Sequence, residues 1–330
     1  MLRRTVGVLK AVDGVSLTLR RGETLGIVGE SGCGKSTLAR VLTAHEQPTS
    51  GEVRVLGRSM AGMRGGELRR ARRHIQLVFQ DPSTSLDPRM TIRDTVREPY
   101  EVNPDLAPRA ERDRRVRELL DVVGLSAAHG ARYPHELSGG QRQRAGIARA
   151  LALRPEILVC DEPVSALDVS VQAQIVNLLE ELREEFGLAY VFIAHDLSVV
   201  QHLADRVAVM YLGRVVETGT EAEVYGQAAH PYTQALLSAA PVPDPAARGT
   251  RQEIVLEGSR PARWSRPPGA PSIRAAGRHR TAARTRRRRW SGGAATWSPV
   301  TWRTRDPAPE PREDGGHVTR PRNPARTADT

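Results

Sequence analysis

The chain has 330 residues and a formal net charge of +11, a balance that invites a nucleic-acid partner. The charge is not spread evenly, because residues 258–330 contain 17 Arg, no Lys and 5 acidic residues, which leaves 32 basic and 33 acidic residues before them. A basic nucleic-acid groove is therefore not a property of the globular part. No run of 18 apolar residues and no signal-peptide core occurs, and the two cysteines, Cys33 and Cys160, exclude a disulfide framework and fit a reducing cytosol.

The N-terminal elements form a strand, loop and helix series. Apolar and polar residues alternate over 12–19, which predicts a strand. A short apolar strand at 24–28 runs into a glycine-rich loop, and 37–42 is helical in pattern. Further strands are predicted at 52–56 and 74–79.

The remaining elements indicate an α/β core with an inserted helical subdomain. The pattern is helical from 91 to about 152 and returns to strands at 157–160 and 190–194. An amphipathic helix lies between these strands, with its apolar stripe at Val171, Ile175, Leu178, Leu179, Leu182 and Phe186. Two runs at 207–211 and 214–218 predict a closing hairpin.

The glycine-rich loop predicts a nucleotide triphosphate site. Gly29 to Thr37 reads GESGCGKST, which fits G-x-x-x-x-G-K-[ST] between a strand and a helix. Glycines let backbone N–H groups turn toward the phosphates, Lys35 would reach the β- and γ-phosphates, and Ser36 would ligate Mg²⁺. The predicted phosphate-binding residues are Gly29, Ser31, Gly32, Gly34, Lys35, Ser36 and Thr37.

Polar residues that end three other strands complete the expected hydrolytic site. Asp161 and Glu162 follow the strand at 157–160, where Asp161 would hold Mg²⁺ and Glu162 would act as general base on the attacking water. Gln80 follows the strand ending at Phe79 and is expected to contact Mg²⁺ or water. His195 follows the strand at 190–194, and we expect it to contact the γ-phosphate.

A second glycine-containing helix start predicts a second subunit. Ser138, Gly139, Gly140 and Gln141 open a helix whose N-terminus could bind an anion. One chain does not need two such sites for one γ-phosphate, so we expect this one to serve the nucleotide held by another subunit.

Together these residues resemble the ATP-binding subunit of ABC transporters over about residues 9–257, and most closely the ATPases of oligopeptide, dipeptide and nickel importers. The resembling stretches are AVDGV at 11–15, FQDP at 79–82, CDEPVSALD at 160–168, AHDL at 194–197 and HPYTQALL at 230–237. The resemblance implies a P-loop NTPase of RecA-like fold, with an ATPase core at 1–90 and 153–218, a helical signature subdomain at 91–152 and a C-terminal extension at 219–257.

The resemblance also implies a mechanism and partners. ATP and Mg²⁺ would be held in a head-to-tail dimer with an identical or sister ATPase, where Ser138 and Gly140 of one subunit face Lys35 and Ser36 of the other and Asp168 links the two sites. The helical subdomain near Gln80 would receive a helix of a membrane permease, at the cytoplasmic face of the membrane. Solute would arrive from an external binding protein, so this chain would not contact the solute itself.

Two alternatives stay open. One is an ABC-type ATPase acting on nucleic acid through the Arg-rich tail, against which stand the single cassette and the neutral core. The other is a truncated or frameshifted product with impaired activity. We expect no nucleic-acid partner.

Two departures from the family pattern concern the ends of the sequence. No aromatic residue precedes Phe79, whereas the family stacks adenine on one upstream of the phosphate loop, so we expect the true start to lie upstream of Met1. Residues 258–330 are Arg- and Pro-rich, with no Leu, Phe, Cys or Lys, and are expected to be disordered. Residues 269–277 can be encoded so that a shifted frame reads Cys-Pro-Phe-His-Pro-Arg-Cys-Arg, like the family's Cys-rich segment. Our hypothesis is a frameshift between about residues 257 and 261.

Overall fold

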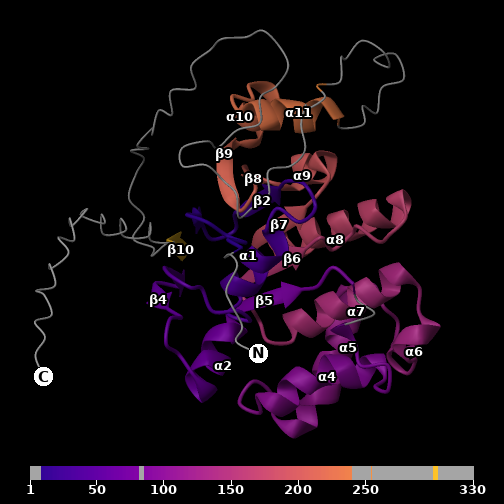
Figure 1. Cartoon of the computed structure of the whole chain (residues 1–330). Coiled ribbons are helices and arrows are strands. Elements are labelled where there is room, and N and C mark those ends of the chain that lie inside the picture. Colours follow the sequence, from indigo (N-terminus) through magenta and orange to yellow (C-terminus); the bar gives the residue numbers. More distant parts are fainter. Residues whose placement is uncertain (1–8, 82–84, 240–253, 255–299, 304–330) are drawn as a thin grey trace, which may run out of the picture.

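The computed structural model in Figure 1 describes residues 9–81, 85–239, 254 and 300–303. Its centre is a six-stranded sheet with the strand order β5-β6-β7-β2-β8-β9, in which neighbours are parallel except for the antiparallel pair β8 and β9. The strands are β2 (Thr24–Val28), β5 (Ile75–Val78), β6 (Ile157–Asp161), β7 (Ala189–Ala194), β8 (Arg206–Tyr211) and β9 (Arg214–Thr220). Every residue of β2, β6 and β7 is buried, which explains why these strands read as continuous apolar runs.

The two faces of this sheet pack against different layers, because successive side chains of a strand point to opposite faces. Ile27 belongs to an apolar cluster shared with α1 (Lys35–Leu42), while its neighbour Val28 belongs to the cluster on the other face. That second cluster includes residues of α8 (Val169–Phe186) and α9 (Leu197–Leu203). The sheet is therefore covered on both sides, as Figure 1 shows.

A smaller antiparallel sheet lies on the α1 side, with the strand order β1-β10-β3-β4. Its strands are β1 (Ser16–Leu19), β3 (Glu52–Val55), β4 (Arg58–Ser59) and β10 (Val300–Arg303), and α2 (Gly65–Arg73) follows β4. β1 begins later than predicted because residues before it turn to the β8–β9 loop: the Asp13 N–H donates to the Gly213 carbonyl at 2.7 Å.

Within the tail at 258–330, which we expect to be disordered, the structure describes the four residues of the strand β10. Its Val-Thr-Trp-Arg sequence favours an extended backbone, and its backbone pairs with β1 on one side and β3 on the other. The register sets Trp302 opposite Leu17 and Val53. The rest of that tail, with the proposed frameshift position, lies outside the described residues, as do residues 1–8.

The inserted region is helical, as the sequence pattern predicts. It contains α4 (Ile92–Val102), a 3₁₀ turn at Arg109–Glu111, α5 (Arg112–Val122), α6 (Ala127–Gly130), a 3₁₀ turn at Pro134–Glu136 and α7 (Gly139–Leu151). Apolar residues of α4, α5 and α7 join the cluster beneath α8, so this subdomain is continuous with the core.

Two helices that the sequence pattern did not predict follow β9. They are α10 (Glu221–Gly226) and α11 (Pro231–Ala239), and Figure 1 shows them at the β8–β9 end of the sheet. In the part of the chain that the structure describes, no helix combines the length and apolar character needed to cross a membrane.

Candidate functional site

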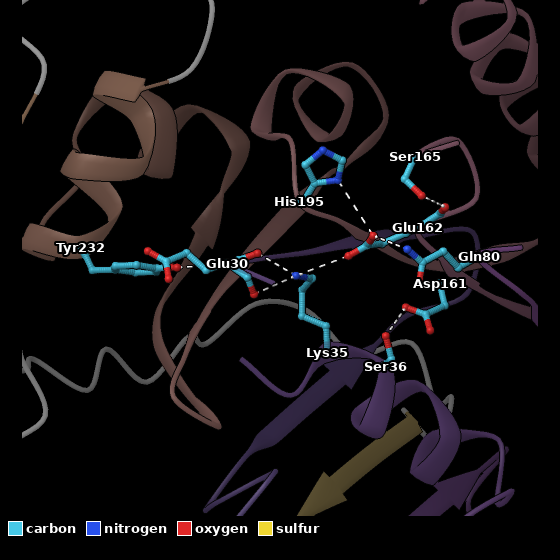
Figure 2. A network of polar contacts seen from close by, with 10 residues as sticks. Glu30, Lys35, Ser36, Gln80, Asp161, Glu162, Ser165, His195 and Tyr232 are labelled. Carbon is cyan, nitrogen blue, oxygen red and sulfur yellow. Dashed lines mark hydrogen bonds and ion pairs between the residues drawn. The ribbon is translucent and has the colours of Figure 1, made fainter. Parts of the chain in front are cut away.

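The predicted hydrolytic residues meet at one edge of the central sheet. The strands β5, β6, β7 and β2 are adjacent and parallel, so their carboxyl ends lie along the same edge. Gln80 follows β5, Asp161 and Glu162 end β6, His195 follows β7, and the phosphate loop follows β2. Figure 2 shows these side chains converging. This edge is where open α/β sheets bind ligands.

The phosphate loop is built to face an anion. Gly34 has φ 115°, and a Cβ there would lie 2.1 Å from the Ala11 carbonyl oxygen, so only glycine fits. Gly32 has φ 77°, and a Cβ there would meet nothing within 4 Å, so the loop is open on that side. The N-cap residue of α1 is Gly34, which has no side chain to cap the helix, and the first turn of α1 contains Lys35, Ser36 and Thr37. Its N–H groups and helix dipole are therefore available to phosphates.

Lys35 is a buried cation at the centre of the site. Its side chain is only 3% exposed. Its Nζ donates to the carbonyl oxygens of Gly29 at 2.7 Å and Glu30 at 3.1 Å, and lies 3.5 Å from the Glu162 carboxylate. A buried ammonium needs such partners.

Glu162 is held in place by both backbone and side chain. Its φ is 47°, a left-handed conformation that is uncommon for a residue with a side chain. Its N–H donates to the Ile193 carbonyl at 2.9 Å, and its own carbonyl accepts from the Ser165 hydroxyl at 3.1 Å. These bonds fix the residue despite the strained backbone, which is common at functional sites.

The Glu162 carboxylate joins three elements. One oxygen lies near Lys35 Nζ, and the other accepts from Gln80 Nε2 at 2.9 Å and lies 3.9 Å from His195 Nδ1 (Figure 2). The carboxylate is 13% exposed and His195 is 57% exposed. The site therefore places a shielded carboxylate beside an exposed imidazole at the carboxyl edge of the sheet.

Asp161 and Ser36 form a second pair beside it. The Ser36 hydroxyl donates to Asp161 Oδ1 at 3.1 Å, and Asp161 is 7% exposed. Burial raises the pKa of Asp161 above its ordinary value, because its charge is poorly solvated. A buried carboxylate of this kind gains from a nearby cation.

The second predicted anion site lies apart from this group. Ser138 caps α7: its hydroxyl accepts from the Gln141 N–H at 3.3 Å, and the Gln141 side chain accepts from the Ser138 N–H at 3.0 Å. A Cβ on Gly140 would come within 2.5 Å of Val171 on α8, so α7 begins against the start of α8. Among the described residues, no hydrogen bond or ion pair joins Ser138, Gly140 or Asp168 to Lys35 or Glu162.

One contact of the phosphate loop was not predicted from the sequence. The hydroxyl of Tyr232 on α11 accepts from the N–H of Glu30 at 2.8 Å, across 202 residues (Figure 2). Tyr232 lies in the HPYTQALL stretch, which marks the resemblance but whose pattern gives no hint of this partner.

Comparisons with known proteins identify the family. Residues 12–165 match the family described as ABC transporter, and residues 216–269 match the oligopeptide/dipeptide transporter C-terminal region. The chain is 53% identical over 270 residues to the oligopeptide transport ATP-binding protein AppF of Bacillus subtilis (strain 168), covering 82% of each chain. The chain belongs to the ABC transporter ATPase family. The predicted fold class and family resemblance are confirmed for this ABC ATPase.

Further relatives agree with this assignment. The ABC ATPase is 55% identical over 262 residues to the oligopeptide transport ATP-binding protein OppF of Salmonella typhimurium (strain LT2), covering 79% of this chain and 78% of the relative. Among solved structures it resembles the ATP-binding cassette MJ0796 in a dimeric post-hydrolysis state bound to ADP and Pi. That match has a TM-score of 0.60 and 32% identity, and covers 67% of this chain and 94% of the cassette.

Proposed function

We propose that this ABC ATPase binds and hydrolyses ATP to power an importer of the oligopeptide, dipeptide or nickel class. The observation that carries the chemistry is the Glu162 carboxylate, which contacts Lys35 and Gln80 at the mouth of an open phosphate loop. The transport names of AppF and OppF and the match at 216–269 support a peptide solute.

The residues present fit Mg²⁺ bound together with ATP. Among the described residues, no three or more His, Cys, Asp or Glu side chains form a cluster that could hold a metal ion by themselves. Magnesium instead tends to take one or two carboxylate or hydroxyl ligands, with waters and phosphate oxygens filling the other positions. Ser36 and the buried Asp161 are such a pair, and Gln80 lies beside Glu162. When bound, the ion would neutralise charge that develops on the phosphate oxygens.

Each side chain then has a distinct role. Lys35 would reach the β- and γ-phosphates. Glu162 would accept a proton from the attacking water, a step typically worth about 10²–10⁴ in rate. Gln80 would orient that carboxylate or the water, and the exposed ring of His195 would contact the γ-phosphate.

The separate position of the second anion site supports an ATP sandwich. Among the described residues, no hydrogen bond or ion pair joins the start of α7 at Ser138, Gly139, Gly140 and Gln141 to Lys35 or Glu162, and we propose that these residues face a nucleotide held by a second subunit. Val169, next to Asp168 at the start of α8, is 82% exposed, so the start of α8 is accessible to a second subunit. The dimeric MJ0796 structure, at 33% identity and a TM-score of 0.57, supports a dimer of such cassettes.

A groove on the helical subdomain supports docking of a permease segment at the cytoplasmic face of a membrane. A cavity of about 270 Å³ lies between the end of β5 and the helices α4 and α7. Phe79 and Val102, which line it, are 40% and 50% exposed. The buried Gln143 also lines it, and its Nε2 has no hydrogen-bond partner among the described residues. An apolar rim with one unused donor fits the end of a helix, whose last carbonyls need donors.

The substitution Glu162→Gln tests the proposed chemistry. The amide keeps the size of the side chain but cannot accept the proton, so the variant should bind ATP, hydrolyse it at least about a hundredfold more slowly and accumulate as a closed dimer. Steady-state phosphate release and size-exclusion chromatography with Mg²⁺-ATP measure both effects. Glu184→Gln, an exposed change on α8, is the matched control. Hydrolysis by the Glu162 variant at the parent rate would refute the assignment.

A further inference from the structure

The peptide between Gly29 and Glu30 is held from both sides. Its carbonyl oxygen, which belongs to Gly29, accepts from Lys35 Nζ at 2.7 Å. Its N–H, which belongs to Glu30, donates to the Tyr232 hydroxyl at 2.8 Å. The two groups of a trans peptide point in opposite directions, so Tyr232 and Lys35 together fix the plane of this peptide (Figure 2).

Tyr232 is itself rigidly placed. Its side chain is 2% exposed, and its ring lies 4.5 Å, centroid to centroid, from that of Tyr211 at the end of β8. Burial raises the pKa of Tyr232 far above its ordinary value, so the hydroxyl stays neutral and can accept the N–H.

The segment leading into α11 is anchored as well. The N–H groups of Ala229 and His230 donate to the two carboxylate oxygens of Glu217 on β9, at 2.7 Å and 3.1 Å. A second tyrosine of the same region, Tyr225 on α10, donates its hydroxyl to the carbonyl of Leu197, two residues after His195. The helices α10 and α11 therefore contact both the phosphate loop and the segment that follows His195.

We propose that Tyr232 is a positioning residue through which the C-terminal helices α10 and α11 set the affinity of the phosphate loop for nucleotide. With the Glu30 N–H engaged by Tyr232, the peptide keeps the orientation that places its carbonyl beside Lys35. Without the hydroxyl this peptide can rotate, and the loop must be reordered each time phosphates bind. The inference rests on the proposed role of residues 29–37 in holding phosphates.

Tyr232→Phe tests this in the full chain because it removes the hydroxyl and keeps the ring. We expect the Kd for Mg²⁺-ATP and the KM of hydrolysis to rise about fivefold, as for the loss of one hydrogen bond, while kcat at saturating ATP stays within about twofold. Tyr190→Phe is the matched control, since that buried hydroxyl donates to the Leu179 carbonyl at the same 2.8 Å but lies away from the loop. Tyr190→Phe should lose about as much folding stability as Tyr232→Phe but keep the KM of the parent.

Two sets of outcomes distinguish failure of the Tyr232 proposal from failure of the phosphate-loop assignment. Equal nucleotide affinities for Tyr232→Phe and Tyr190→Phe would overturn the inference, provided that Lys35→Ala abolishes binding. Binding that survives Lys35→Ala would instead overturn the phosphate-loop assignment itself. If Tyr232→Phe does not fold, hydrogen exchange in the unsubstituted chain decides: the Glu30 amide should be protected like the β2 amides, and rapid exchange of it would refute the hydrogen bond on which the inference stands.

Discussion

At the residue scale, the site is a set of charges that are tolerated because each has a partner. Lys35 is buried and depends on two carbonyls and Glu162. Burial raises the pKa of Asp161, and the hydrogen bond from the Ser36 hydroxyl offsets only part of that rise. The ionised form of Asp161 is therefore electrostatically unfavourable in the free site, and a bound cation would stabilise it.

The substitution Asp161→Asn should stabilise the nucleotide-free chain at neutral pH. The raised pKa means that the ionised form is less favourable in the folded than in the unfolded chain. The loss of folding stability is absent at a pH below the pKa of Asp161 in the unfolded chain. It is complete once the pH exceeds the pKa of Asp161 in the folded chain. The asparagine removes it, and its oxygen can still accept from Ser36.

Thermal unfolding measures this effect. The Tm of Asp161→Asn should exceed that of the parent at pH 7, with a difference that shrinks as the pH falls toward about 4. Added Mg²⁺-ATP should raise the Tm of the parent by more than that of the variant. A variant less stable than the parent at pH 7 without nucleotide would contradict the assigned cost.

At the element scale, the order of the parallel strands brings most of the site residues together. Strands β5, β6, β7 and β2 are separated in the sequence, yet their adjacency brings one functional residue after each to the same edge. Phe79, which follows β5, and Val102, at the end of α4, both line the proposed docking groove.

The substitution Val102→Glu should weaken docking without harming the fold, because the side chain is 50% exposed. A charge on the rim would have to lose water against an apolar partner, so capture of co-expressed permease subunits should fall at least about tenfold. ATP binding by the isolated chain should not change. Phe186→Glu, at an exposed apolar position on α8, is the control. Undiminished capture of permease by Val102→Glu would rule out this groove.

At the scale of the whole molecule, the sequence predicted what depends on local pattern. The strand at 24–28 was predicted at its observed limits, and the helix between Asp161 and His195 was found because its stripe is periodic. The helix α2 was not predicted, since none of its residues is buried and only Leu68 and Ala71 of it pack against the apolar core. Tyr232 was missed as a loop contact, and β10 as a strand, because their partners lie about 200 residues or more away and only the tertiary fold supplies them.

The central claim is that the edge shared by β2, β5, β6 and β7 holds the phosphates of ATP, and the chain offers a clean test. It contains only two lysines, Lys10 and Lys35, of which Lys10 is an exposed residue 3.9 Å from Asp13. Calorimetric titration with Mg²⁺-ATP should show binding to the parent and to Lys10→Ala with equal affinity, and none to Lys35→Ala. Binding by Lys35→Ala with the parent's affinity would contradict the account.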